Sequence, residues 1–320
     1  YSIASGWGTF VDLEFMPGNS NVIYAAFKQY SDDSAPYRSI DGGASWARID
    51  SGLLPDRYNV EIAVTDANPD VIYAAFTTYD DYHGLYKSNN LGDTWVLQSD
   101  TPNIITRQGW YNLSLAIDPV NESNVWLGGV WQRNSVDDGQ SWNYVYGVHA
   151  DQHYAEYNPL NNTLYVANDG GIYKYVNNTF LNISDDLRIT QFYKLGLSLT
   201  NPDKLVGGTQ DNGTHLLNNS MFDNIRGSDG MECAISKDNE NKIFSSSQYG
   251  GLSRCDDISL PNYVWDWIKP VNYDGAWVTP YKLHPMNNNM IVAGYNEVYR
   301  SFDSGNNWDS ISNFGKGLIK

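Results

Sequence analysis

The chain of 320 residues has little cysteine and little positive charge. Two cysteines, Cys233 and Cys255, are too few for a disulfide framework or a four-cysteine zinc site, and we expect both to be small core residues. Lysine and arginine number 20 against 37 aspartate and glutamate residues, which gives a formal net charge of −17. This charge repels nucleic-acid phosphates and anionic lipid, and no basic stripe interrupts it. The composition therefore argues against nucleic acid as a partner.

Long apolar runs are also missing. No stretch is long enough to cross a bilayer as a helix, and residues 1–9 carry no basic-then-apolar leader, although a leader could already have been removed. We therefore expect no membrane insertion. Hydrophobic residues make up 41% of the chain and aromatic residues 14%, so there is ample material for a packed core.

What the chain does contain is a repeat. Seven times, a turn rich in Asn, Pro and Asp is followed by an apolar strand. These strands begin near Val22, Val71, Val125, Leu164, Leu205, Ile243 and Ile291. The spacing of roughly 40 to 50 residues is typical of β-propeller blades. We predict an all-β fold: a single seven-bladed β-propeller of four-stranded antiparallel blades over residues 1–320. The expected blades are approximately 9–50, 58–99, 110–147, 148–185, 190–226, 230–270 and 276–313.

The second half of the repeat carries a sharper motif. Four times a strand runs into Ser-x-Asp/Asn-x-Gly-x-Ser/Thr/Asn-Trp, starting at Ser39, Ser88, Ser135 and Ser301. In such a hairpin the Asp or Asn side chain accepts backbone N–H groups of the turn, Gly takes a positive φ and Trp buries a large ring. Each residue type thus has a structural reason to be present, so we assign these residues no chemistry.

Five further segments, in the middle of the chain, add to this pattern: residues 109–113, 148–153, 168–173, 207–213 and 229–233. The four hairpins resemble the Asp box, or BNR repeat, of a propeller superfamily that includes sialidases, sortilin-type receptors and xyloglucan-directed glycoside hydrolases. The middle segments are similar to large secreted bacterial proteins, many from Bacteroidota, that are labelled BNR-repeat glycosyl hydrolases. The resemblance implies a secreted or cell-surface protein directed at glycans. No C-terminal sorting domain of the kind these proteins carry is visible, which is consistent with a fragment, or the ordered part, of a longer protein.

Successive turns of a four-stranded blade alternate between the two faces of a propeller. Links between blades and turns between second and third strands should therefore share the face opposite the Asp boxes. Asp169 and Asp211 occupy corresponding turns there, in neighbouring blades. Paired carboxylates flank the scissile bond in glycoside hydrolysis, so we name these two as candidate catalytic residues. The alternative is structural: Asp before Gly is an ordinary hairpin-turn signature and would be present without a substrate.

Other polar and aromatic residues fall on the same face. The candidate ligand-binding residues are Trp110, Arg107, Asp229, Glu232 and Gln210. Among the tryptophans at positions 7, 110, 131 and 277, we expect one or two to offer a flat ring for sugar stacking. Arg107, Arg188 and Arg226 could form an arginine cluster, but the Arg-Ile-Pro sequence of sialidases is absent, which disfavours that activity.

His149, Asp151 and His153 enter the first strand of blade 4 at alternate positions. Strand periodicity would point all three side chains the same way. Two imidazoles and a carboxylate can hold a divalent metal ion, and a hydrogen-bonded polar network is the alternative. The sequence requires no cofactor.

Two functions compete. One is an extracellular glycan-directed propeller that binds or hydrolyses polysaccharide at the face opposite the Asp boxes; if it is an enzyme, it resembles a glycoside hydrolase. The other is a non-enzymatic adhesion or scaffold module that contacts another cell-surface protein through its rim and long links, because fold alone does not fix function.

Overall fold

The structure, a computed structural model, describes residues 7–31, 33–184, 187, 190–218 and 221–314. Over these residues the chain forms seven four-stranded antiparallel sheets and one short 3-10 helix, η1 (Gln248–Gly250). Each sheet consists of four strands that are consecutive in sequence and pair in sequence order. The predicted all-β class and the predicted seven four-stranded blades are confirmed.

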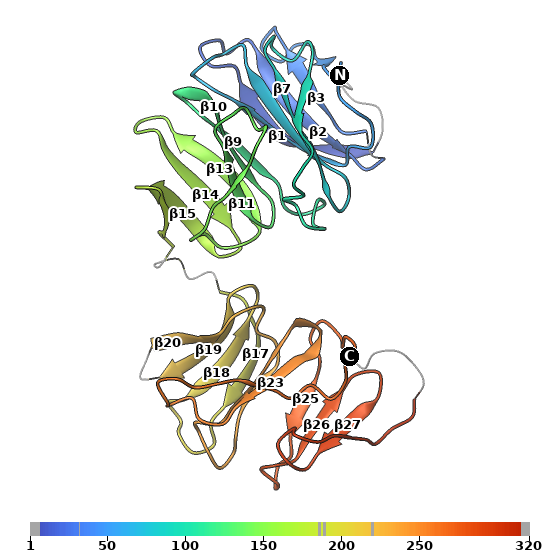
Figure 1. The fold of residues 1–320 in the computed structure, drawn as a ribbon, viewed down its shortest axis with the longest axis vertical. Coiled ribbons are helices and arrows are strands. Elements are labelled where there is room, and N and C mark those ends of the chain that lie inside the picture. Colours follow the sequence, from blue (N-terminus) through green and yellow to red (C-terminus); the bar gives the residue numbers. More distant parts are fainter. Residues whose placement is uncertain (1–6, 32, 185–186, 188–189, 219–220, 315–320) are drawn as a thin grey trace. The chain divides into compact units, whose positions relative to one another are not determined.

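The chain divides into two compact units, Tyr1–Leu187 and Arg188–Lys320. Figure 1 draws the first from blue to green and the second from yellow to red. The strands of the first unit are β1 (Gly8–Phe15), β2 (Ile23–Gln29), β3 (Ala35–Ser39) and β4 (Ala47–Arg48) in sheet 1; β5 (Asn59–Val64), β6 (Ile72–Thr77), β7 (Tyr82–Ser88) and β8 (Val96–Ser99) in sheet 2; β9 (Ser114–Asp118), β10 (Asn121–Gly128), β11 (Gln132–Ser135) and β12 (Asn143–Tyr144) in sheet 3; and β13 (Gln152–Asn158), β14 (Thr163–Asn168), β15 (Gly171–Val176) and β16 (Thr179–Asn182) in sheet 4.

The second unit holds the remaining three sheets. Its strands are β17 (Phe192–Leu197), β18 (Leu205–Thr209), β19 (Gly213–Asn218) and β20 (Met221–Arg226) in sheet 5; β21 (Cys233–Ile235), β22 (Ile243–Ser247), β23 (Gly251–Cys255) and β24 (Asp266–Trp267) in sheet 6; and β25 (Tyr281–Leu283), β26 (Ile291–Gly294), β27 (Val298–Ser301) and β28 (Asp309–Ser310) in sheet 7.

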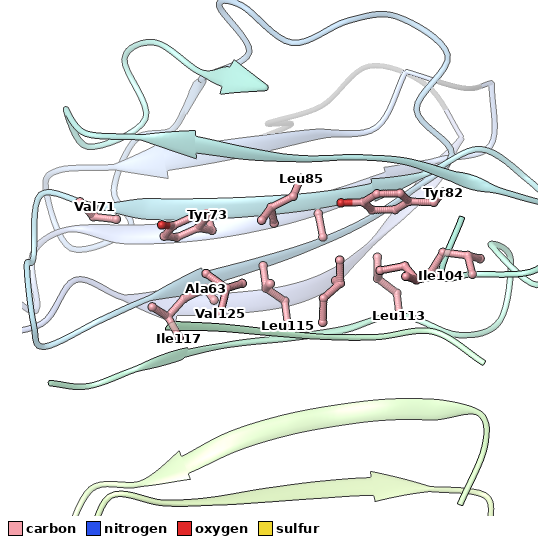
Figure 2. Close-up of a cluster of buried hydrophobic side chains, with 13 residues drawn as sticks. Ala63, Val71, Tyr73, Tyr82, Leu85, Ile104, Leu113, Leu115, Ile117 and Val125 are labelled. Atoms are coloured by element: carbon pink, nitrogen blue, oxygen red, sulfur yellow. The ribbon is translucent and has the colours of Figure 1, made fainter. Parts of the chain in front are cut away.

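The larger buried clusters of the first unit lie between neighbouring sheets, and one small cluster lies within sheet 1. Figure 2 shows the cluster between sheets 2 and 3, where Tyr73 and Leu85 of one sheet face Leu115 and Val125 of the other. All four side chains are buried. Burying such side chains stabilises the fold by about 1.5–3 kcal/mol each, so the sheets are held together by face-to-face packing.

The four Ser-x-Asp/Asn hairpins close on their own side chains. In the first, Ser39 Oγ donates to Asp41 Oδ1 (2.8 Å) and accepts from Gly43 N (2.9 Å). Ser45 N donates to the same Asp41 oxygen (2.8 Å), and Gly43 has a φ of +91°. The corresponding bonds are present in the hairpins that start at Ser88, Ser135 and Ser301. These are the bonds that the residue types of the motif predict.

Both cysteines are buried free thiols, as expected. Cys233 lies on β21 and Cys255 on β23, with β22 between them. Within the described part of the chain, no helix has the length and apolar character needed to cross a membrane.

Candidate functional site

The link between β8 and β9 brings an aromatic pair to one end of sheets 3 and 4. Gly109 anchors this link, because its N–H donates to Asp80 O (3.0 Å) and its carbonyl accepts from Thr77 Oγ1 (2.8 Å). A Cβ at position 109 would lie 2.4 Å from the carbonyl oxygen of Thr78, so only glycine fits. The residue after it, Trp110, is therefore held in one place.

Trp110 and Tyr111 form an exposed aromatic surface. Their ring centroids lie 5.2 Å apart, and the two residues are 47% and 42% exposed. Lys28 Nζ donates to the Trp110 carbonyl (3.2 Å), and Tyr111 N donates to Gln108 O (2.9 Å). Trp110 was predicted from the sequence, but Tyr111 was not. Its position beside a predicted Trp was the only indication available.

Asp169 lies in the two-residue loop between β14 and β15 and receives hydrogen bonds from two side chains. His153 Nε2 lies 2.6 Å from Asp169 Oδ1, and Tyr111 Oη donates to Oδ2 at 3.2 Å. The Tyr111 and His153 rings also meet edge to face at 4.7 Å. Because an ionised carboxylate only accepts hydrogen bonds, His153 carries its proton on Nε2. Asp169 is thus a fixed carboxylate beside an exposed aromatic ring.

Asp151 is the second carboxylate of this cluster. The two amide protons of the fully buried Asn112 go to Asp151 Oδ1 (2.6 Å) and to Gln108 Oε1 (2.5 Å). Burial raises the pKa of Asp151, and the negative charge of Asp169 adds to that rise, whereas the hydrogen bond from Asn112 opposes it. The two carboxylates therefore stand in different environments within one cluster.

The backbone at the predicted metal site departs from the expected strand. Strand β13 begins only at Gln152, and Asp151 has a φ of +63°, so the expected alternation of His149, Asp151 and His153 is wrong. His149 Nδ1 lies 3.0 Å from Ala150 O instead. Among the residues that the structure describes, no three or more His, Cys, Asp or Glu side chains are arranged to hold a metal ion. Asp151 and His153 instead take part in hydrogen bonds, with Asn112 and Asp169 respectively, as the alternative of a hydrogen-bonded network predicts.

Three other predicted residues, Gln210, Asp211 and Asp229, belong to the second unit, and two of them contact each other there. Asp211 has a φ of +58° in the loop between β18 and β19, and its N–H donates to Oδ1 of the buried Asp229 (2.9 Å). Gln210 N donates to Gln191 O (2.9 Å), and its carbonyl accepts from Asn212 N (2.7 Å). Asp229 therefore holds the shape of the loop that presents Asp211.

Glu232 and Arg226 make structural contacts in the same unit. The buried Glu232 pairs with Lys282 through Oε1 and Nζ, 2.6 Å apart. Arg226 donates to the carbonyls of Ser245 (2.9 Å) and Gly251 (3.2 Å) and thereby ties sheet 5 to sheet 6. These contacts fix the position of both side chains within the second unit.

The remaining candidates belong to different parts of the chain. Arg107 is exposed and has a φ of +66°, and Arg188 lies outside the described residues. Trp277 donates from Nε1 to Tyr193 Oη (3.2 Å) in the second unit. Asp169 and Asp211 belong to different units, so their catalytic pairing stays a prediction.

Comparison with known proteins identifies similar structures only. No family model and no curated protein matches the chain. The chain is similar to a GH74 enzyme from Niastella koreensis (TM-score 0.47, 17% identity), covering 97% of this chain and 60% of that one. It is also similar to an ancestral GH74 enzyme (TM-score 0.42, 18% identity; 99% and 49% covered) and to YCF48 from Cyanidioschyzon merolae (TM-score 0.42, 11% identity; 93% and 96% covered). The chain thus spans about three fifths and about half of the two GH74 enzymes.

Proposed function

We propose that the chain is a glycan-directed domain of the Asp-box propeller type, secreted or displayed on a cell surface. Its polysaccharide site is the Trp110 cluster, which we define as Trp110, Tyr111, Asp151, His153 and Asp169. The observation that carries the proposal is the exposed aromatic pair placed directly against a fixed carboxylate. The Asp-box and Bacteroidota-type resemblance of the sequence supports the extracellular placement.

The chemistry of a sugar fits this arrangement. The apolar C–H face of a pyranose ring stacks on an aromatic ring, while its hydroxyl groups need acceptors at the ring edge. Trp110 supplies the flat ring, and Asp169 supplies an acceptor whose position His153 and Tyr111 fix. Because these side chains are already held, little conformational entropy is lost on binding.

Hydrolysis is the second part of the proposal. A glycoside hydrolase needs one carboxyl group that can donate a proton and one that stays ionised. Asp151, with its raised pKa, suits the acid, and Asp169, with two hydrogen bonds donated to it, suits the ionised partner. Asp211 remains the alternative partner that the sequence predicts.

The binding half is tested by titrating the intact chain with a panel of soluble polysaccharides by calorimetry. We expect Trp110→Ala to weaken binding at least tenfold and Tyr111→Phe, which removes the hydroxyl group that donates to Asp169, to weaken it less. Trp267→Ala, which removes an exposed ring in the second unit, is the matched control and should bind as the wild type does. Equal binding by the Trp110→Ala and Trp267→Ala variants would contradict the site.

The catalytic half is tested by release of reducing ends from any polysaccharide that binds. Asp151→Asn and Asp169→Asn should each abolish release, and an Asp169→Ala/Asp211→Ala double variant tests the pair predicted from the sequence. Unchanged release in all three variants would remove the catalytic assignment. If no polysaccharide binds the wild type, the adhesion alternative takes precedence.

A further inference from the structure

A cavity lies at the outer edge of the first unit, between sheets 3 and 4. It has a volume of about 450 Å³. Its lining residues are Trp126, Asn134, Asn143, Tyr144, Val145, Tyr146, Gly147, Tyr175, Asn178 and Thr179. The loop that carries Asp169 precedes β15 and the turn that carries Asn178 follows it, so this cavity and the Trp110 cluster involve opposite ends of that strand. We name this cavity the edge groove.

The register of sheet 3 places polar and aromatic side chains in one row. Trp126 pairs with Asn134, and Asn134 pairs with Asn143, across β10, β11 and β12. Cross-strand partners share one face of a sheet, so the three side chains point into the same groove. The other wall is Tyr175 of β15 and the turn after it, and the Tyr175 ring meets Trp126 edge to face at 4.7 Å.

The aromatic rings at the mouth of the edge groove contact each other and remain accessible to solvent. The rings of Tyr144 and Tyr146 have centroids 4.4 Å apart, and Tyr146 is 77% exposed. The guanidinium of Arg133 lies 4.4 Å from the Tyr144 ring centroid and covers one face of it. Tyr146 is therefore the ring with a face left for a ligand, fixed from behind by Tyr144.

The lining is neutral although the protein is strongly acidic. None of the ten described residues that line the groove is charged, while the chain as a whole carries a formal net charge of −17. The amides of Asn143 and Asn178 and the hydroxyl of Thr179 provide donors and acceptors. The Asn134 amide nitrogen already donates to Asn124 Oδ1 and to the Val125 carbonyl, so Asn134 offers only its oxygen. A ligand that suits this lining is neutral, rich in hydroxyl groups and flat on one side.

We infer that the edge groove is a second carbohydrate site, which takes a neutral saccharide of one or two ordered sugar units with a pyranose ring stacked on Tyr146. Its volume lies within the range of pockets for ligands of that size. It acts independently of the Trp110 cluster and gives the domain two contacts with one polymer. Two linked contacts raise the apparent affinity for a long chain above that for either site alone.

The test is calorimetric titration of the intact chain with neutral hexasaccharides of glucose, xylose and mannose, and with an oligogalacturonate hexamer. We expect two sites per chain for one of the neutral sugars. Tyr146→Ala should remove one site and leave the melting temperature unchanged, because the side chain is mostly exposed. Asn143→Asp, which keeps the shape and adds a charge, should weaken the same site at least tenfold.

The Trp110→Ala variant distinguishes the two proposals, because it should remove binding at the Trp110 cluster and leave binding at the edge groove. Tyr79→Ala, at an exposed tyrosine outside both sites, is the matched control. Wild-type stoichiometry in both edge-groove variants would overturn the second site, whatever Trp110→Ala does. Equally tight binding of oligogalacturonate to the groove would overturn the neutral ligand class.

Discussion

At the scale of single residues, one hairpin shows that an amide can replace the carboxylate of the Ser-x-Asp motif. Asn90 accepts from Ser88 Oγ (2.8 Å) and Thr94 N (3.0 Å), as the aspartates do in the other three hairpins. We therefore expect Asp137→Asn to lower the free energy of unfolding less than Asp137→Ala does. Asp137→Ala, which leaves its donors unpaired, should cost about 1–2 kcal/mol in urea unfolding. Equal losses in the two variants would contradict this role.

The same hairpins give a prediction about stability in acid. Hydrogen bonds from Ser45 and Ser39 hold the pKa of Asp41 at about 2, and corresponding bonds do the same for Asp137 and Asp303. Because the pKa is lower in the folded than in the unfolded state, this stabilisation is complete above about pH 4 and is lost as the pH falls to about 2. A variant with all three aspartates changed to asparagine should lose less stability over that range in thermal melts. An equal loss would assign acid sensitivity to other groups.

The two cysteines give a prediction about reactivity. Burial raises the pKa of the Cys233 thiol to about 12 and also raises that of Cys255. Since the thiolate is the reactive form, neither residue should react with a disulfide reagent in the native protein within minutes. Both should react at once in denaturant. Fast labelling of the native protein would show that sheet 6 opens locally.

At the scale of elements, the link before β9 depends on a glycine. A methyl group at position 109 collides with the Thr78 carbonyl, so Gly109→Ala should cost about 1–3 kcal/mol and displace Trp110. Polysaccharide binding should fall with it, by roughly tenfold. Gly227→Ala is the matched control, because nothing lies within 4 Å of its added methyl group. A Gly109→Ala variant that binds normally would show that Trp110 does not need this anchor.

At the scale of elements, the sequence predicted the local structure only in part. Pattern alone predicted that positions 149, 151 and 153 continue a strand, but Asp151 turns into the left-handed region to meet Asn112. That turn depends on a contact between residues 39 positions apart, which no local pattern records. Tyr111 was not predicted for the same reason, because its contact with Asp169 joins residues that are far apart in the sequence. Asp169, in contrast, lies in the tight turn that its Asp-Gly sequence predicts.

At the scale of the whole unit, acidic residues of the first unit act on one another from the first strands of sheets 1, 2 and 4. Burial, with the charges of Asp12 and Glu156, raises the pKa of Glu14 from 4.5 to about 8. A carboxyl group with a raised folded-state pKa contributes stability at low pH that is lost as the pH rises, here between about 4.5 and 8. We expect Glu14→Gln to raise stability at pH 8 by about 1 kcal/mol, roughly 2–4 °C in melting temperature, and to leave it unchanged at pH 4. Equal effects at both values would exclude this ionisation as the cause.

The number and order of the sheets were predictable because each repeat encodes its own strands and turns. Four hairpins with Trp and seven Asn- and Pro-rich turns set a regular spacing that only stacked, similar sheets satisfy. The positions of candidate residues on links and second-to-third-strand turns follow from that count. The contacts among these residues do not follow from that count, because Tyr111, His153 and Asp169 meet only after sheets 3 and 4 have packed.

Every sheet is made from strands that are neighbours in the chain, and this bears on how the protein is made. A ribosome releases one complete sheet after roughly every 45 residues, so pairing within a sheet never waits for a distant segment. The apolar faces, however, are covered only when the next sheet arrives. During synthesis, the apolar face of each new sheet should therefore be exposed to solvent for a short time, until the following repeat covers it. A pause of the ribosome within a repeat should be the step most prone to aggregation.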